Sequence, residues 1–152
     1  MGLFSRKPAP QPTASDLLDE EYFVSDGSVL LGSAGEDMDA ETDVVGESEY
    51  RDVLARHIRI CADDRDMKRG RLDSTFTLDL EGNRISVILA IDVIGYVEPT
   101  AAAEWLPRIR DWRSRDVEVM CSGVILWNPK LGNPVESDDV PIGARLDLVD
   151  QT

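Results

Sequence analysis

Residues 71–97 read RLDSTFTLDLEGNRISVILAIDVIGYV, and this stretch decides the fold class. Apolar and polar side chains alternate over residues 72–80, which is the period of a strand with one buried face. The next residues, Glu81-Gly82-Asn83, favour a tight turn. The first part of the stretch therefore predicts a half-buried strand that ends in a turn.

The second part of the stretch predicts two more strands. Residues 84–91 are apolar on nearly both faces, so we expect a central strand here. A bend at Asp92 leads into Val93-Ile94-Gly95-Tyr96-Val97, which predicts a third strand.

An amphipathic helix is expected before these strands. Its apolar face follows the spacing i, i+3, i+4, i+7, i+8 and i+11 and comprises Tyr50, Val53, Leu54, His57, Ile58 and Cys61. Ser48 is placed to cap the N-terminus of this helix. Residues 63–70 then predict a charged loop that Gly70 closes.

A second helix is expected after the three strands. Pro99 suits the first position of a helix, and Pro107 is expected to kink or break it. The reason is that proline has no amide hydrogen to donate to the carbonyl of residue 103.

The rest of the chain predicts two more strands. Alternation at residues 117–121 leads into residues 124–127, and we expect Gly123 to form a bulge between them. Residues 128–141 are rich in Pro, Gly and Asp and predict a loop, and residues 144–148 predict the last strand.

The expected fold class is α+β and mainly β. Many short strands with few helices favour a small barrel or half-barrel, spanning residues 44–150. The apolar share of 42% permits a packed core.

Residues 1–43 are expected to form an acidic disordered tail. They hold ten acidic and two basic side chains, and prolines recur early in the segment. Residues 22–31 differ, because two apolar triplets flank an Asp-Gly pair. This segment is expected either to form a short hairpin or to dock onto the domain.

Composition and charge narrow the classes of function. No run of apolar residues is long enough for a membrane-spanning helix, so we expect a cytoplasmic protein with no membrane partner. The net charge of −14 argues against non-specific binding of duplex DNA. Arg outnumbers Lys, which hints at a GC-rich bacterial or phage genome.

Catalytic and metal-binding patterns are missing from the sequence. His57 is the one histidine, and the two cysteines, Cys61 and Cys121, are expected to be reduced core thiols. The phosphate-loop, dinucleotide-binding and nucleophile-elbow motifs are absent. We therefore expect no enzymatic activity and no cofactor.

Candidate binding residues fall into two groups. Lys68, Arg69 and Arg71 form the most basic spot in the chain and can contact phosphates, or they can pair with the acidic residues around them. Tyr50, Tyr96 and Trp127 can stack on bases if their rings are exposed, or pack in the core.

Four segments, taken in order, resemble a known family. Residues 44–51 read VVGESEYR and resemble the opening VVGES-x-Y-Q of HIRAN domains. Residues 85–99 are similar to the family's AVAVYIDGxxVGYLP, and residues 101–105 to its DAAxY helix. Residues 142–148 match the terminal GVxLDL strand of bacterial members.

The resemblance implies an OB-like, HIRAN-like barrel with two helices. In characterised eukaryotic members the domain grips single-stranded DNA at a free 3′ hydroxyl, with the terminal bases stacked on aromatic rings. The residues carried over by position are Tyr50, Asn83 and Tyr96. This chain departs from the family at Glu49, where end-binding members have an aromatic residue, and in the shortened turn at residues 81–84.

Two functions remain open at this point. The first is a non-catalytic module that binds single-stranded DNA or its 3′ end, with phosphate contacts from Arg51, Arg84 or the basic loop at residues 68–71. The alternative is a protein-interaction domain of the same fold that has lost nucleic-acid binding. It would hold its partner through the acidic tail or a sheet edge.

Overall fold

The run of three strands forms as the alternation predicts. The computed structural model describes residues 27–32 and 40–149. In it the long strand β3 (Arg71–Glu81) turns at Gly82 into β4 (Arg84–Leu89), and β4 leads into β5 (Asp92–Val97). Each strand pairs antiparallel with the next.

Three further strands close the sheet into a barrel. β6 (Glu118–Trp127) pairs with β3, and β2 (Thr42–Val45) pairs with β5. β7 (Ile142–Leu146) pairs with both β2 and β6, which completes a closed antiparallel barrel of six strands over the described part of the chain. The α+β, mainly β fold and the small OB-like barrel are therefore confirmed.

The barrel interior is filled by apolar side chains from the inward faces of the strands. Those with no exposed surface include Phe76, Ile85, Val87, Ile94, Val119, Ile125 and Leu146. Burial on this scale is the main favourable term in the folding of a small barrel.

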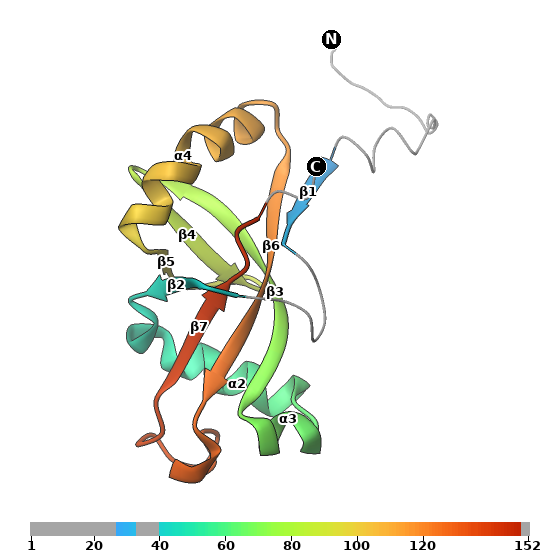
Figure 1. Ribbon diagram of the computed structural model, residues 1–152, viewed down its shortest axis with the longest axis vertical. Helices are drawn as coiled ribbons and strands as arrows, with labels where there is room; N and C mark the ends of the chain where they lie inside the picture. Colours follow the sequence, from blue (N-terminus) through green and yellow to red (C-terminus); the bar gives the residue numbers. More distant parts are fainter. Residues whose placement is uncertain (1–26, 33–39, 150–152) are drawn as a thin grey trace, which may run out of the picture.

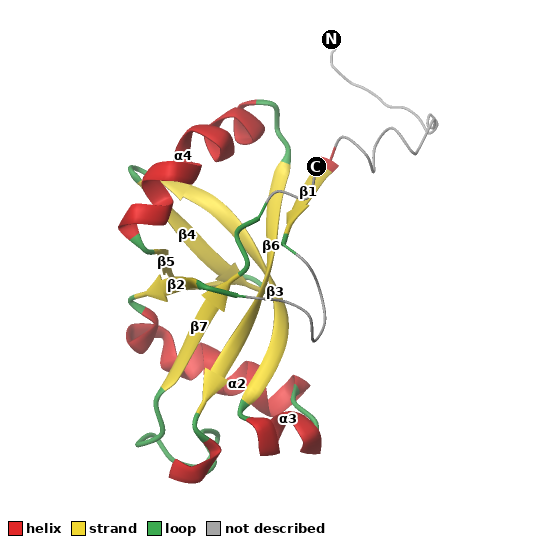
Figure 2. Ribbon diagram, viewed as in Figure 1, coloured by secondary structure: helices red, strands yellow, loops and turns green. Residues whose placement is uncertain are grey.

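Helices lie near the two ends of the barrel (Figures 1 and 2). A 3-10 turn, η2 (Glu47–Tyr50), leads into α2 (Arg51–Cys61), which lies with the short helix α3 (Asp64–Arg69) toward one end. α4 (Pro99–Ser114) lies toward the other end and packs against β3, β4 and β6. No helix among residues 27–32 and 40–149 is long and apolar enough to cross a membrane.

A seventh strand comes from the segment that was expected to be a tail. β1 (Ser28–Leu31) pairs parallel with residues 118–121 of β6, and Leu31 is fully buried. β7 covers only residues 123–127 of the same edge of β6, so β1 fills the half that β7 leaves open. Of the two expectations for residues 22–31, residues 28–31 show docking. Residues 22–26 lie outside the described residues.

The connection between α2 and β3 differs from the loop that was expected. Residues 64–69 form helix α3, because the side chain of Asp63 accepts a hydrogen bond from the amide of Asp66. In turn, the side chain of Asp66 accepts a hydrogen bond from the amide of Asp63. This reciprocal capping box satisfies the free amides of a helix start. The capping role of Asp63 went unrecognised because the charged residues 63–70 were interpreted as a loop.

Pro107 does not break its helix, and the bulge expected at Gly123 is absent. α4 continues through Pro107 as one helix, because Trp105 and Ile109 on either side are buried while Pro107 itself is exposed. Gly123 forms no bulge, since β6 keeps a continuous register with β3. It is required instead by close packing, as an added Cβ would lie 2.4 Å from the carbonyl oxygen of Arg145 and 2.8 Å from the Phe76 ring.

Smaller differences occur at element ends. The central strand stops at Leu89, and Ile91 lies at a turn with 91% of its surface exposed. The irregularity in the sheet falls between Val87 and Ile88, where the register of β4 and β5 shifts. Ser48 does not cap α2, because η2 precedes that helix and no side chain caps either element.

Candidate functional site

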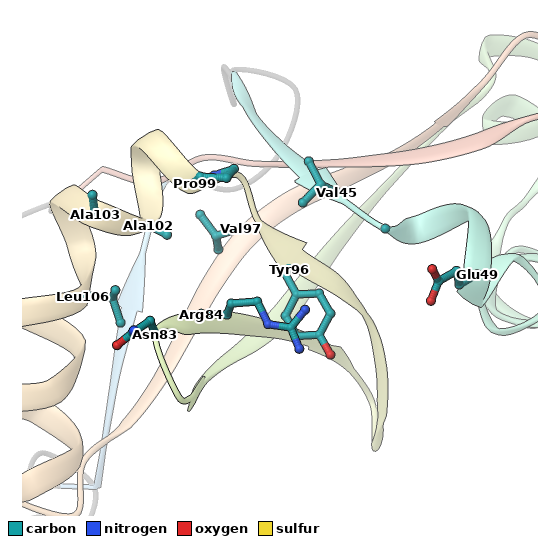
Figure 3. Close-up of a pocket in the computed structure, with 11 residues that line it drawn as sticks. Val45, Glu49, Asn83, Arg84, Tyr96, Val97, Pro99, Ala102, Ala103 and Leu106 are labelled. Atoms are coloured by element: carbon teal, nitrogen blue, oxygen red, sulfur yellow. The ribbon is translucent and has the colours of Figure 1, made fainter.

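An open pocket lies between β2, β5, the β3–β4 turn and α4. Its volume is about 340 Å3, which is in the range of small-molecule sites. The wall is mainly apolar and is formed by Val45, Val97, Pro99, Ala102, Ala103 and Leu106. Polar groups enter from Asn83 in the β3–β4 turn, from Arg84 on β4 and from Tyr96 on β5 (Figure 3).

The local backbone explains why Tyr96 reaches this pocket. Gly95 has φ 154° and lies against β2, where an added Cβ would be 2.6 Å from the carbonyl oxygen of Val45. Only glycine permits this close approach of the two strands. The following residue, Tyr96, pairs with Val45 and lines the pocket.

Arg84 and Tyr96 form a stacked pair. The guanidinium carbon of Arg84 lies 3.7 Å from the centre of the Tyr96 ring, within the distance of a cation–π contact. Glu81 holds both groups, because Arg84 Nη2 donates to Glu81 Oε2 at 2.9 Å and the Tyr96 hydroxyl donates to the same oxygen at 3.2 Å. Figure 3 shows the Arg84 guanidinium in front of the Tyr96 ring.

The surroundings of the Tyr96 hydroxyl favour its neutral form. Partial burial and a hydrogen bond with Tyr50 raise the pKa of Tyr96 above its usual value, although the positive charge of Arg84 acts in the opposite direction. A neutral hydroxyl remains a hydrogen-bond donor at physiological pH. Tyr50 is half-buried and does not line the pocket, so it supports Tyr96 from behind the site.

A second arginine stands beside the pocket. Arg110, exposed on α4, directs its Nη2 at Asn83 Oδ1 over 3.4 Å. Asn83 lines the pocket, and Leu106, one helical turn before Arg110, lines it too. Sequence reasoning missed Arg110, because only the tertiary fold brings α4 to the β3–β4 turn.

Arg51, one of the sequence-predicted phosphate contacts, serves another purpose. Its Nη2 donates to the carbonyl oxygens of Pro134, Ser137 and Val140 at 2.7–3.0 Å, and its Nε donates to Val140 at 3.1 Å. These bonds tie α2 to the loop before β7. With its donors aimed at this loop, Arg51 is not part of the pocket.

The basic spot at residues 68–71 also lies away from the pocket. It sits at α3, near the end of the barrel opposite α4 (Figure 1). Arg69 pairs with Asp66 at 3.0 Å, and Arg71 pairs with Asp73 at 2.9 Å. The local ion pairs weighed against phosphate contacts are therefore present for both arginines, while Lys68 is exposed beside a separate shallow hollow.

Two further candidates, Trp127 and Cys61, do not line the pocket. Trp127 is 7% exposed and belongs to the core, so it offers no stacking surface. Cys61 is exposed, unlike the core thiol that was expected, because it ends α2 at the solvent side. Within residues 27–32 and 40–149, no group of three or more His, Cys, Asp or Glu is placed to hold a metal ion.

Comparison with known proteins adds no relative. No family model, no curated protein and no solved structure matches the chain. What the site can do follows from its own geometry. An apolar wall faces a guanidinium stacked on a tyrosine, and an asparagine at the edge offers both a donor and an acceptor.

Proposed function

We propose that the protein is a non-catalytic binding module whose pocket receives the terminal base of a single-stranded DNA. The observation that carries this proposal is the Arg84–Tyr96 stack inside a mainly apolar pocket. Bases stack on aromatic rings and on guanidinium planes, and one unstacked base suits a pocket of this size. Membership of the HIRAN family and a cytoplasmic location are part of the same proposal.

Each wall of the pocket has a role in this binding mode. Arg84 presents its free face to the base, because Tyr96 covers its other face and Glu81 fixes its orientation. The opposite face of the base contacts the apolar wall formed by Ala102, Ala103 and Leu106. Asn83 hydrogen-bonds an edge of the base, as amides commonly do in base recognition.

A protein-interaction domain remains the second candidate because of Glu49. This carboxylate lines the pocket and opposes a phosphate, and the whole chain carries a charge of −14. An apolar side chain from a partner protein would fill the same wall without that repulsion. Val45, which is 39% exposed, would extend the contact surface at the rim.

Fluorescence anisotropy of a short labelled single strand tests the proposal. The full chain is used, because a chain that begins at residue 44 would lack β1 and the first half of β2. We expect binding to the single strand, weaker binding when the 3′ end carries a phosphate, and no comparable binding to a blunt duplex. Equal affinity for all three would indicate non-specific phosphate contacts, which fade as salt rises. No binding at low salt would exclude the DNA function and leave the protein-interaction domain.

A further inference from the structure

The rim of the pocket carries two arginines whose electrostatic surroundings differ. Arg84 is paired with Glu81 at 2.9 Å, so its positive charge is compensated within the protein. Arg110 contacts Asn83 over 3.4 Å, and this partner is a neutral amide. The positive charge of Arg110 is therefore available to a ligand, whereas that of Arg84 is already used.

Two arginines that follow Arg110, Arg113 in α4 and Arg115 directly after it, resemble Arg84 and not Arg110. Arg113 lies 3.3 Å from the carboxylate of Asp79, and Arg115 lies 2.9 Å from that of Asp111. Exposed pairs of this kind contribute little to stability, yet they neutralise the local field that an anion would meet. Among these arginines, Arg110 is the one at the pocket that pairs with no carboxylate of residues 27–32 and 40–149.

Position supports the same conclusion. Arg110 follows Leu106 by one helical turn, and Leu106 lines the pocket. The guanidinium is directed toward the β3–β4 turn by Asn83, which also lines the pocket. A group held at Asn83 and Arg110 would lie just outside the space that the base fills.

We infer that Arg110, oriented by Asn83, binds the phosphate group next to the base held in the pocket. This inference rests on the proposed function and adds a residue to it. In this arrangement Arg84 stacks on the base, and Arg110 supplies the positive charge that binds the phosphate. A guanidinium suits this task because it offers several donors in one plane to phosphate oxygens.

The assignment is tested by the salt dependence of single-strand binding in variants of the full chain. Arg110→Ala removes the charge, and Arg110→Lys keeps it. Arg115→Ala is the matched control, since Arg115 is exposed directly after the same helix but paired with Asp111. Circular dichroism of each variant checks that α4 and the barrel are intact.

We expect Arg110→Ala to reduce the slope of log K against log salt by about 0.7, the value for one phosphate contact on a single strand. Arg110→Lys and Arg115→Ala should keep the slope of the wild-type protein. If the wild-type protein binds the strand and Arg110→Ala has an unchanged slope, the assignment of Arg110 is wrong while the proposed function stands. If the wild-type protein does not bind the strand, the proposed function fails and this inference fails with it.

Discussion

Replacement of Arg51 by alanine should destabilise the protein without acting on the pocket. Arg51 is mostly buried, with 16% of its side chain exposed, and its guanidinium bonds three carbonyl oxygens of the loop before β7. Its ion pair with Asp138 adds little, because the Asp138 side chain is 98% exposed. The expected loss of stability therefore comes from the hydrogen bonds to the three carbonyl oxygens.

The size of the effect follows from these contacts. A hydrogen bond with a charged donor contributes about 1.5–3 kcal/mol, and the contributions of several bonds to one guanidinium do not add in full. We therefore expect a loss of about 2–3 kcal/mol in the free energy of unfolding. For a domain of this size that lowers Tm by roughly 5–10 °C.

Urea unfolding of Arg51→Ala, followed by circular dichroism, measures this loss. Arg51→Lys should recover little of it, because a single ammonium group cannot reproduce the planar set of donors. Arg59→Ala is the control, since Arg59 is exposed on the same helix. An unchanged midpoint for Arg51→Ala, together with weaker DNA binding, would refute the structural role and return Arg51 to the ligand contacts.

Three further results are expected. Gly123→Ala should lower the unfolding midpoint in urea strongly, because its Cβ would meet the Arg145 carbonyl at 2.4 Å, and an unchanged midpoint would contradict the packing described for β6. Burial lowers the pKa of His57, so on acidification the unfolded state binds a proton before the folded state does. The free energy of unfolding should therefore fall as pH drops below about 6.5, and His57→Gln should remove this part of the pH dependence. Burial raises the pKa of the Cys121 thiol to about 12, so a thiol reagent at mildly alkaline pH should modify Cys61 in the native protein and both cysteines only after unfolding.

The sequence predicted the strands well because each has a strong local signal. The alternation over residues 72–80 places apolar side chains on one face of the sheet, which predicts a strand with one buried face. The apolar run after the turn predicts a strand that is buried on both faces. A barrel was predicted from the many short strands and from the resemblance to a family. Its register had no local signal, because β7 pairs with β2 and β6 from distant parts of the chain.

The errors occurred where tertiary contacts outweigh a local rule. Proline usually interrupts a helix, yet the packing of Trp105 and Ile109 keeps α4 continuous through Pro107. Docking was one of the two alternatives expected for residues 22–31, but the sequence did not reveal its place, because β1 pairs with β6 from a distant part of the chain and buries Leu31 there.

The candidate site was predictable only in part. Asn83, Arg84 and Tyr96 were all named from the sequence, and the structure brings them together in one pocket. The basic spot at residues 68–71 lies away from the pocket, and a local density of charge does not reveal that Arg69 and Arg71 are ion-paired. Arg110 had no signal in the sequence, because its distance from Asn83 depends on how α4 packs.

The most direct test of the central claim is to fill the pocket and measure single-strand binding. Ala103 is exposed on α4 and lines the pocket, so Ala103→Trp should occupy the space of the base without disturbing the core. Ser114→Trp, at the far end of the same exposed surface of α4, is the matched control. We expect the wild-type protein and Ser114→Trp to bind the strand with equal affinity, and Ala103→Trp to lose about tenfold or more, as for a lost base-stacking contact. Binding by Ala103→Trp equal to that of the wild-type protein would contradict the claim that a base enters this pocket.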